Sequence, residues 1–439
     1  MNRIQRLQSA IQSSFAEFFQ RSTSTGIIIL AMTAIALIWT NSGAHNSYLA
    51  LLHQPVEFGF GSLHLHFTFE HFVNDGLMVL FFLVVGLEIK RELLVGELST
   101  RKKALLPMIA AVFGMIGPAV TYLALNAGTP AVRGWGVPVA TDIAFALGVL
   151  ALLGDRVPSG LRVFLAALAI VDDLLAVVVI AVFYTASLHV SMLLAAAGIT
   201  ALLYIGNRLR IYSLWFYGIL GFALWIVVLS SGIHATIAGV VLAMCIPAES
   251  RIDRVSFFAR ARGVLDAIAH RTETDEEEGA QLDAVHSLER MCEHVQTPLH
   301  RIVHGLGGFV SFIIMPLFAL VNAGVRIEPE MMSSVLSPVS VGIAMGLFLG
   351  KQVGISFAVW LSCKLGISRL PSGVSMAQMY GVSILCGIGF TMALFVAHLA
   401  FLDPAHLAMS KLSILIGSTL SAIVGAAVLS FFLPKKSVA

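Results

Sequence analysis

The chain has 439 residues, of which 58% are hydrophobic and only 12% are charged, and its formal net charge is +2. About a quarter of the residues in a typical soluble domain are charged, whereas the mean hydropathy here reaches +0.89. This composition excludes an ordinary soluble protein and predicts a polytopic membrane protein. The thinly spread charges also exclude a nucleic-acid partner.

The polar N-terminal segment, residues 1–25, is expected to lie in the cytoplasm and to carry no cleavable signal. Its apolar residues fall near one helical face, which is typical of an interfacial helix; a frayed tail is an equal alternative. Twelve apolar runs follow, and each is expected to cross the membrane as a helix. They lie near 26–42, 72–89, 105–125, 135–152, 162–185, 189–206, 212–230, 232–247, 305–324, 340–361, 379–401 and 412–433.

Basic residues are distributed asymmetrically between the loops on the two sides of these spans. With both termini inside, the inside segments hold 23 of the 27 Lys and Arg residues. The outside segments hold three, namely Arg133, Arg326 and Lys411, and Lys351 lies within a span. Since cytoplasmic loops are enriched in Lys and Arg, this bias predicts a multi-pass membrane protein with both termini in the cytoplasm.

Two loops stand out. In residues 53–69, apolar and polar residues alternate around Gly61 and Ser62, a pattern that predicts a β-hairpin. Residues 248–304 form the longest polar stretch and are expected to be a cytoplasmic loop whose acidic run is solvated. Spans 1–8 then occupy 26–247, spans 9–12 occupy 305–433, and residues 434–439 form a cytoplasmic tail.

Four charged residues lie deep within predicted spans: Asp142, Asp172, Asp173 and Lys351. A buried ion pair that only fixes helix packing would account for one acid and the lysine, but it leaves two acids unmatched. Charged groups at this depth are expensive and usually mark ion or proton pathways. Adjacent residues of a helix point about 100° apart, so one of the two neighbouring aspartates can face Lys351 while the other faces a water-filled cavity.

Two spans contain residues that interrupt helices. Pro138 shortly precedes Asp142 in the fourth span, and proline removes a backbone donor. Gly387 and Gly389 lie in the middle of the eleventh span. Glycines in a span also permit close packing, but together with the fourth span they predict broken helices that meet at the membrane midplane, as in secondary transporters.

Seven stretches of the chain resemble the signature sequences of NhaA-type Na+/H+ antiporters. They are VNDGLMVLFFLVVGLEIKREL, ATDIAFALGVLALLG, LAIVDDLLAVVVIAVFYT, SGIHATIAGV, MPLFALVNAGV, LGKQVGIS and CGIGFTM. The stretches follow the order of the family, and the resemblance covers nearly the whole chain. The resemblance implies an all-α membrane fold of twelve transmembrane helices with inverted-topology repeats, in which spans three to five are repeated in inverted sense by spans ten to twelve, and two broken helices, spans 4 and 11.

The resemblance also implies roles for individual residues. It assigns ion binding and proton transfer to Asp172, Asp173, Thr141, Asp142 and Lys351. Of these residues, Asp172, Asp173 and Thr141 are expected to bind Na+. Helix breaks fall at Pro138, Gly387 and Gly389. A response to pH is linked to Glu88, Arg91, Glu92, His234 and His304. The resemblance further implies a homodimer formed through the 53–69 hairpin, a bacterial inner-membrane location, and no cofactor beyond the transported Na+ and H+.

The chain departs from the family pattern before the ninth span. Members often carry Leu-Glu-His there, whereas the matching residues are Ile302, Val303 and His304, so the acid is missing. A later histidine of that segment is replaced by Gly307. These departures concern the response to pH and leave the transport residues unchanged.

The expected function is exchange of intracellular Na+, and of Li+, for external protons, for pH and sodium homeostasis. Two crowded carboxylates resist being ionised together, so protons and Na+ compete for the same oxygen atoms. The resemblance implies that more protons than Na+ move per cycle, which makes the exchange electrogenic. A sodium-coupled symporter of the same architecture and a channel are the alternatives. An intramembrane aspartyl protease is disfavoured because its two aspartates lie on different spans.

Overall fold

The computed structural model describes most of the chain. The described residues are 24–60, 63–185, 188–250, 254–269, 285–289, 291–292, 295–329 and 334–434. The interfacial helix predicted before residue 24, the turn of the predicted hairpin and the acidic run 272–279 lie outside them.

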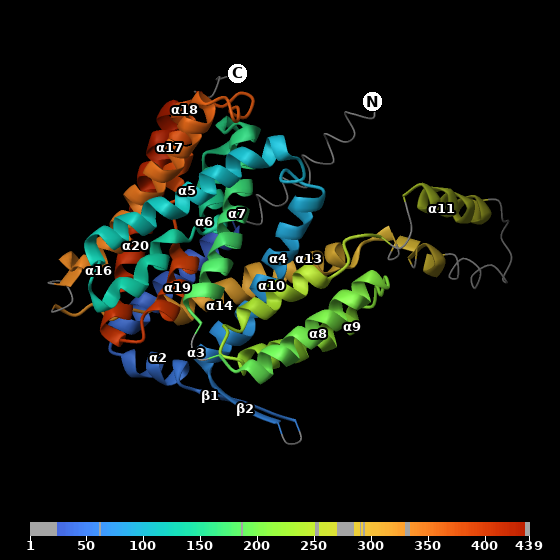
Figure 1. Ribbon diagram of the computed structural model, residues 1–439, viewed down its shortest axis with the longest axis horizontal. Helices are drawn as coiled ribbons and strands as arrows, with labels where there is room; N and C mark the ends of the chain where they lie inside the picture. The colour runs from blue at the N-terminus through green and yellow to red at the C-terminus, as the bar shows by residue number, and fades with distance from the viewer. Residues whose placement is uncertain are drawn as a thin grey trace.

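The described residues form a bundle of apolar helices (Figure 1). Eight of these helices are long and apolar enough to cross a membrane, and two bent helix pairs raise the number to ten. The eight are Ser24–Asn41; Phe69–Leu94, made of α3 (Phe69–His71), η1 (Phe72–Leu77) and α4 (Met78–Leu94); α5 (Arg101–Asn126); α7 (Ser159–Phe183); α8 (Val190–Arg208); Pro298–Asn322, made of α13 (Pro298–Phe309), η4 (Val310–Ile314) and α14 (Met315–Asn322); Pro338–Lys364, made of α16 (Pro338–Met345), η6 (Gly346–Gly350) and α17 (Lys351–Lys364); and α20 (Pro404–Phe432). The bent pairs are η2 (Pro130–Val139) with α6 (Ile143–Leu152), and α18 (Met376–Leu385) with α19 (Phe390–Ala400). The prediction of an all-helical polytopic membrane protein is confirmed.

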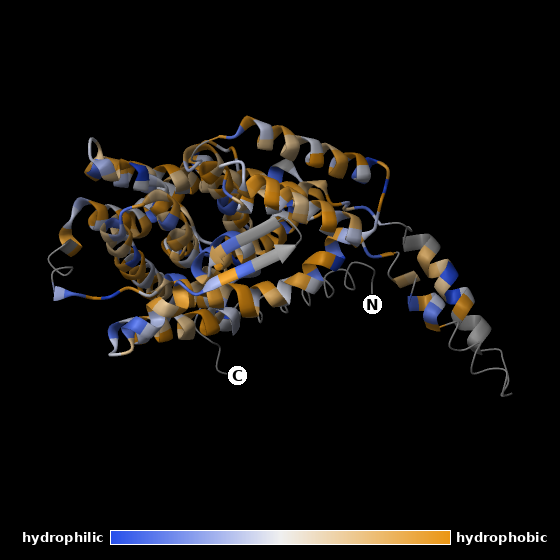
Figure 2. Cartoon of the chain, turned by 90° about the horizontal axis from the view of Figure 1, so that it is seen from below, coloured by the Kyte–Doolittle hydropathy of each residue, from blue (hydrophilic) through white to orange (hydrophobic). Residues whose placement is uncertain are grey.

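Two further apolar helices are shorter. They are α9 (Leu214–Leu229) and α10 (Thr236–Cys245), which rise about 24 Å and about 15 Å at 1.5 Å per residue, against a hydrocarbon core of about 30 Å. They occupy the seventh and eighth predicted spans. Because both are shorter than the helices counted above, the total of twelve spans stays a prediction. Apolar residues cover much of the bundle (Figure 2). Large apolar side chains such as Trp215, which is 81% exposed, suit a surface that faces lipid.

Helices α4 and α10 lie in unusually close contact. A Cβ atom on Gly239 of α10 would overlap the carbonyl oxygen of Val79 of α4, so only glycine permits this approach. Near the end of α4, Lys90 Nζ donates to the carbonyl oxygens of Met244 at 2.7 Å and Ile246 at 2.5 Å. A cation at the carbonyl end of a helix is favourable. The two helices are therefore joined both near the start of α4 and near its end.

The predicted tenth span contains a π-helical turn. This turn, η6, ends at Gly350, directly before Lys351. π-turns interrupt the regular hydrogen bonding of a helix and often occur at functional sites. Lys351 begins α17 with 0% of its surface exposed, so the irregular turn sets the direction in which a buried ammonium group points.

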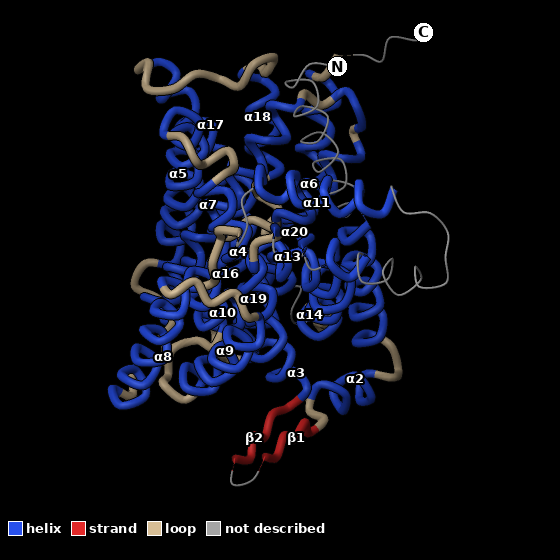
Figure 3. The backbone as a smooth tube through the Cα atoms, turned by 90° about the vertical axis from the view of Figure 1, so that its right-hand side faces the viewer, coloured by secondary structure: helices blue, strands red, loops and turns tan. Residues whose placement is uncertain are grey.

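The predicted hairpin region forms two paired strands. Strands β1 (Pro55–Phe60) and β2 (Leu63–Thr68) are antiparallel, with Pro55 opposite Thr68. They project from one end of the bundle beside α2 (His45–Leu52) and α3 (Figure 3). This end is called the hairpin end below, and the connection between α17 and α18 lies at the opposite end.

Two helices lie in or overlap the predicted cytoplasmic loop 248–304, and the boundaries of that loop at the membrane stay a prediction. Helix α13 begins at Pro298, because the Thr297 side chain accepts a hydrogen bond of 3.1 Å from the His300 N–H and proline suits the first helical position. Residues 298–304 are therefore helical. Helix α11 (Arg254–Ala269) lies in the predicted loop, before the acidic run that was predicted to be solvated.

The helix that contains the predicted last span begins before that span. Helix α20 begins at Pro404 and not near residue 412, because Asp403 caps it by accepting from the His406 N–H. Hydrogen bonds from the backbone N–H and side chain of His406 hold the pKa of the Asp403 carboxyl below its usual range. Lys411, which was assigned to an outside segment, consequently lies within α20, where it is only 8% exposed.

Candidate ion-binding site

Two short non-helical segments cross near the centre of the bundle. The first separates η2 from α6, which are bent by 42°, and the second separates α18 from α19, which are bent by 47°. The Asp142 N–H donates to the carbonyl oxygen of Ile388 at 2.6 Å. The Thr141 hydroxyl donates to the carbonyl oxygen of Cys386 at 2.9 Å. Backbone groups released by one break are therefore satisfied by the other.

Small residues permit this crossing. A Cβ atom on Gly389 would lie 2.8 Å from the carbonyl oxygen of Ala140, and one on Gly387 would overlap the carbonyl oxygen of Leu347. Pro138 lies near the end of η2, two residues before the extended Ala140. The three residues predicted to break the spans thus lie in or beside the two breaks.

The Asp142 carboxylate lies at the start of two helices. Its Oδ1 accepts from the Phe145 N–H at 3.1 Å, which caps α6. Its Oδ2 accepts from the Thr391 N–H at 3.0 Å and from the Thr391 hydroxyl, which lies in the first turn of α19. Helix N-termini carry partial positive charge, so two helix ends neutralise this buried acid. Asp142, predicted as an ion ligand, is here largely occupied by protein donors.

Asp172 and Asp173 of α7 face different partners. Lys351 Nζ lies 2.6 Å from Asp172 Oδ2, and neither side chain is more than 1% exposed. The expected pairing of Lys351 with an aspartate is therefore present. Oδ1 of Asp172 and Oδ1 of Asp173 are buried and have no hydrogen-bond partner among the described residues. Such unsatisfied carboxylate oxygens are costly and are the kind of ligand that protons and hard cations seek.

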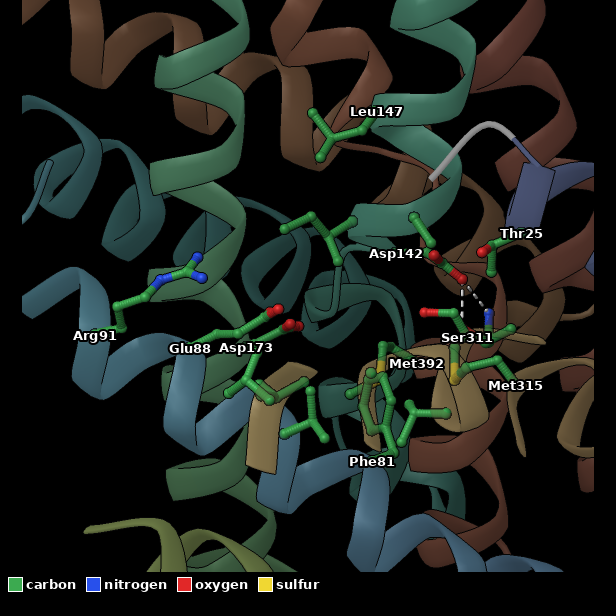
Figure 4. Close-up of a pocket in the computed structure, with 18 of the residues that line it drawn as sticks. Thr25, Phe81, Glu88, Arg91, Asp142, Leu147, Asp173, Ser311, Met315 and Met392 are labelled. Atoms are coloured by element: carbon green, nitrogen blue, oxygen red, sulfur yellow. Dashed lines mark hydrogen bonds between the residues drawn. The ribbon is translucent and has the colours of Figure 1, made fainter. Parts of the chain in front are cut away.

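A cavity of about 430 Å3 reaches from the end opposite the hairpin to these acids. Asp173, Asp142, Glu88 and Arg91 line it, whereas Asp172 does not. Figure 4 shows Glu88 and Asp173 pointing into the same part of the cavity, with Asp142 across from them. Asp142, Asp172, Glu88 and Lys351 are all near enough to act on Asp173 electrostatically. One acid of the pair thus lines the cavity and the other does not, although both side chains are buried.

The mouth of the cavity holds most of the residues linked to pH response. Arg91 lies 3.4 Å from the Glu92 carboxylate, which also accepts from the Glu97 N–H at 3.0 Å. His304 of α13 lines the cavity. His300, which sequence reasoning had placed in a loop, lines it as well, and the two imidazole centroids are 6.2 Å apart.

His234 lies elsewhere. It precedes α10 near the hairpin end, and its Nε2 is 3.1 Å from Asp75 Oδ1 of η1. Its ring meets the Phe395 ring edge-on with centroids 5.1 Å apart. His234 therefore does not share the cavity with Glu88, Arg91 and His304, and Glu92, which contacts Arg91, does not line the cavity either.

Sequence reasoning missed Thr391 and Lys411. Thr391 follows Gly389 by two residues, so its place in the first turn of a half-helix was a signal for contact with a buried acid. Lys411 was missed because the apolar run was started after it, although the Asp403-Pro404 cap signal precedes it.

Comparisons with known proteins agree with this geometry. The sequence model of a family described as Na+/H+ antiporter 1 matches residues 16–429. A protein named Na(+)/H(+) antiporter NhaA from Oleidesulfovibrio alaskensis is 50% identical over 394 residues, covering 89% of this chain and 88% of the relative. Proteins of the same name from Koribacter versatilis and Caulobacter vibrioides are 48% and 45% identical over 390 and 394 residues, covering 89% and 90% of this chain and 85% and 84% of the relatives. The chain therefore belongs to the Na+/H+ antiporter 1 family.

Proposed function

We propose that this Na+/H+ antiporter exchanges Na+ for protons at one site formed by Asp172 and Asp173, with Thr141 contributing a hydroxyl oxygen. The supporting observation is the buried Asp173 carboxylate, which lines a cavity beside the Asp172–Lys351 ion pair. Asp173 Oδ1 has no hydrogen-bond partner among the described residues, so it is free to hold either substrate.

Competition for the same oxygens is sufficient for antiport. A Na+ ion that reaches Asp173 attracts both carboxylates and weakens the hold of Asp172 on Lys351. Protons that arrive from the other side neutralise the acids and release Na+. If only loaded forms change access, each Na+ that leaves is matched by protons that enter, and no second site is required.

The exchange is electrogenic if more than one proton enters for each Na+. Asp172, Asp173 and Lys351 together provide more than one group that can change protonation. Each net positive charge that enters gains about 2.3 kcal/mol per 100 mV of membrane potential. The cell's potential then drives Na+ extrusion.

The orientation follows from the positive-inside bias, which places both termini in the cytoplasm. The cavity then opens to the cytoplasm, and the hairpin lies on the outer face of a bacterial inner membrane. In this state cytoplasmic Na+ reaches Asp173 directly. Contacts among α19, α14 and α4 close the other side, where Phe395 packs against Phe82 and Phe318 with ring centroids 5.4 Å and 6.2 Å apart.

We further propose twelve spans, with α9 and α10 as the seventh and eighth. The two bent pairs would then be spans 4 and 11, equivalent positions of inverted repeats that comprise spans three to five and ten to twelve. Two copies of the chain would associate through the hairpin, and Li+ would be carried as a second, similar hard cation.

Na+-dependent proton movement in everted membrane vesicles tests the function. Addition of Na+ should dissipate a preformed acid interior in the absence of any organic solute, and Li+ should do the same. A requirement for an organic co-substrate would indicate a symporter, which nothing in the cavity favours. Na+ entry without proton movement would indicate a channel.

A further inference from the structure

A second group of buried ionisable side chains lies at the hairpin end, remote from the mouth of the cavity. His398 of α19 lies with its Nδ1 3.8 Å from Glu70 Oε1 of α3. Lys411 of α20 acts on both of them electrostatically. The three residues, named the outer triad here, come from three different elements, and none takes part in the site described above.

The triad is only partly shielded from the hairpin side. The Glu70 side chain is 27% exposed and that of His398 is 16% exposed, whereas Lys411 is 8% exposed. Nε2 of His398 is buried and has no hydrogen-bond partner among the described residues. The partly exposed Glu70 carboxylate thus lies beside the His398 imidazole. The second nitrogen of that imidazole is buried and is available as a hydrogen-bond donor or acceptor.

One face of α19 joins the triad to the ion-binding site. Thr391, Phe395 and His398 are spaced four and three residues apart, so they lie along one side of the helix. Thr391 donates to Asp142, and His398 lies beside Glu70. The rise between Thr391 and His398 is about 10 Å, and the cavity lining on α19 stops at Thr391 and Met392. Phe395, which is 1% exposed, fills the interval.

We propose that the outer triad is a proton-loading site for the antiporter, so the inference rests on the proposed function. Glu70 takes a proton from the hairpin side and passes it to His398 Nδ1. In the outward-open form, in which Phe395 no longer fills the interval, His398 then releases a proton from Nε2 to water, which carries it to Asp173. The gap of 3.8 Å is longer than a direct hydrogen bond, so the first transfer needs one bridging water or a small side-chain rotation.

Lys411 gives the site its selectivity. Lys411 interacts electrostatically with Glu70 and repels Na+ while its ammonium group is charged, whereas a proton can be accepted by the carboxylate and passed on. Na+ released toward the hairpin side is therefore discouraged from returning. Among the described residues, His71 also acts on His398, and Glu70 acts on the Tyr48 hydroxyl. His71 Nε2 in turn lies 3.7 Å from Asp75 Oδ2. The Tyr48 hydroxyl donates to the carbonyl oxygens of Leu320 and Val321, so it is occupied.

The test varies the pH on each side separately. Right-side-out vesicles with a fixed interior pH and fixed interior Na+ are placed at external pH values from acidic to alkaline, and Na+ efflux is followed. We expect Glu70→Gln and His398→Gln to slow efflux about tenfold at alkaline external pH, where protons are scarce, and to approach the wild-type rate at acidic external pH. The apparent affinity for interior Na+ should not change.

Lys411→Met should instead make efflux about tenfold more sensitive to inhibition by external Na+. Glu57→Gln and His406→Gln are the matched controls, since both residues lie near the same end, are exposed and are outside the triad. Glu70→Asp keeps the carboxylate, so it should restore most of the rate of Na+ efflux at alkaline external pH. If Glu70 had only a structural role, the shorter side chain would not be expected to restore this rate.

The proposal is overturned if either Glu70→Gln or His398→Gln follows the wild-type external pH profile, or if the defect follows the interior pH. If one of these variants does not assemble, the other carries the same expectation. A wild-type protein that shows no Na+-dependent proton movement would instead contradict the proposed function, so the two failures are distinguishable.

Discussion

Asp142 and Thr391 are 249 residues apart in the sequence, yet the Asp142 carboxylate accepts from both the backbone N–H and the hydroxyl of Thr391. The same carboxylate caps α6 through the Phe145 N–H. One buried acid thereby ties together the two half-helices that begin at the crossing. A displacement of α19 cannot leave α6 unaffected without breaking a charge-assisted hydrogen bond.

Loss of this link should destabilise the bundle. Thr391→Val removes the hydroxyl donor, and we expect the free energy of unfolding to fall by about 1–3 kcal/mol, since a bond to a charged acceptor is lost in a buried place. Thr391→Ser keeps the hydroxyl and should behave like wild type. Thermal unfolding in detergent compares the three proteins, and equal stability of the Val and Ser variants would show that the hydroxyl bond is unimportant.

Asp173→Asn and Asp172→Asn should each abolish Na+-driven proton movement or reduce it to near background. Each removes one of the two carboxylates for which Na+ and protons compete. The measurement is the vesicle assay at saturating Na+, with Asp403→Asn as the control because asparagine also caps helices well. Near-normal activity of Asp173→Asn would contradict a shared site.

Lys351→Met should lower the free energy of unfolding more than the double variant in which both Lys351 and Asp172 are replaced. It leaves Asp172 buried without its 2.6 Å partner, and breaking a buried pair costs about 3–5 kcal/mol. The double variant Asp172→Asn, Lys351→Met should recover much of this loss while remaining inactive. Unfolding midpoints of the two single variants and the double variant form the cycle, and additive effects would contradict a direct pair.

Removal of the hairpin should favour monomers and leave part of the transport intact, since the ion-binding residues all come from one chain. Residues 55–68 are replaced by a short Gly-Ser linker, and the fraction of dimer is measured by cross-linking in detergent. A replacement of Glu57 by Gln within an intact hairpin serves as the control. An unchanged dimer fraction after the deletion would place the interface elsewhere.

Val303→Glu should sharpen the pH profile of transport and shift it toward alkaline pH. Val303 lines the cavity together with His300 and His304, so a carboxylate there adds a titrating group at the entrance for Na+. The profile is measured at several Na+ concentrations, with Val303→Gln as an uncharged control. If the profiles of Val303→Glu and wild type coincide at saturating Na+, the response to pH arises from proton competition at Asp172 and Asp173 alone.

Much of the site could be predicted from the sequence because buried charges are few. A lysine in mid-span needs an acid, so an ion pair of Lys351 with Asp172 or Asp142 was predictable. The choice between them was not, because it depends on how α7 is rotated against α17. The location of His234 also depends on packing: the resemblance linked it to the response to pH but gave it no partner, and its partner Asp75 lies near the hairpin.

The ends of the helices were predicted less well than their centres. Hydropathy places the start of a span where the apolar run begins, whereas caps such as Thr297 and Asp403 begin the helix earlier. That difference concealed Lys411 and His300 within helices. The π-turn before Lys351 also has no signature in the hydropathy, since it changes the hydrogen bonding of the backbone and not the composition.

That turn, η6, sets the angular position of Lys351. A π-turn holds about one residue more than an α-turn, and one residue corresponds to a rotation of about 100°. Regular α-helical hydrogen bonding through Gly346–Gly350, with the sequence unchanged, would therefore rotate the ammonium group around the helix axis and away from Asp172, while the chemistry of every side chain stayed the same. The geometry of the Asp172–Lys351 ion pair therefore depends on one irregular turn of the backbone.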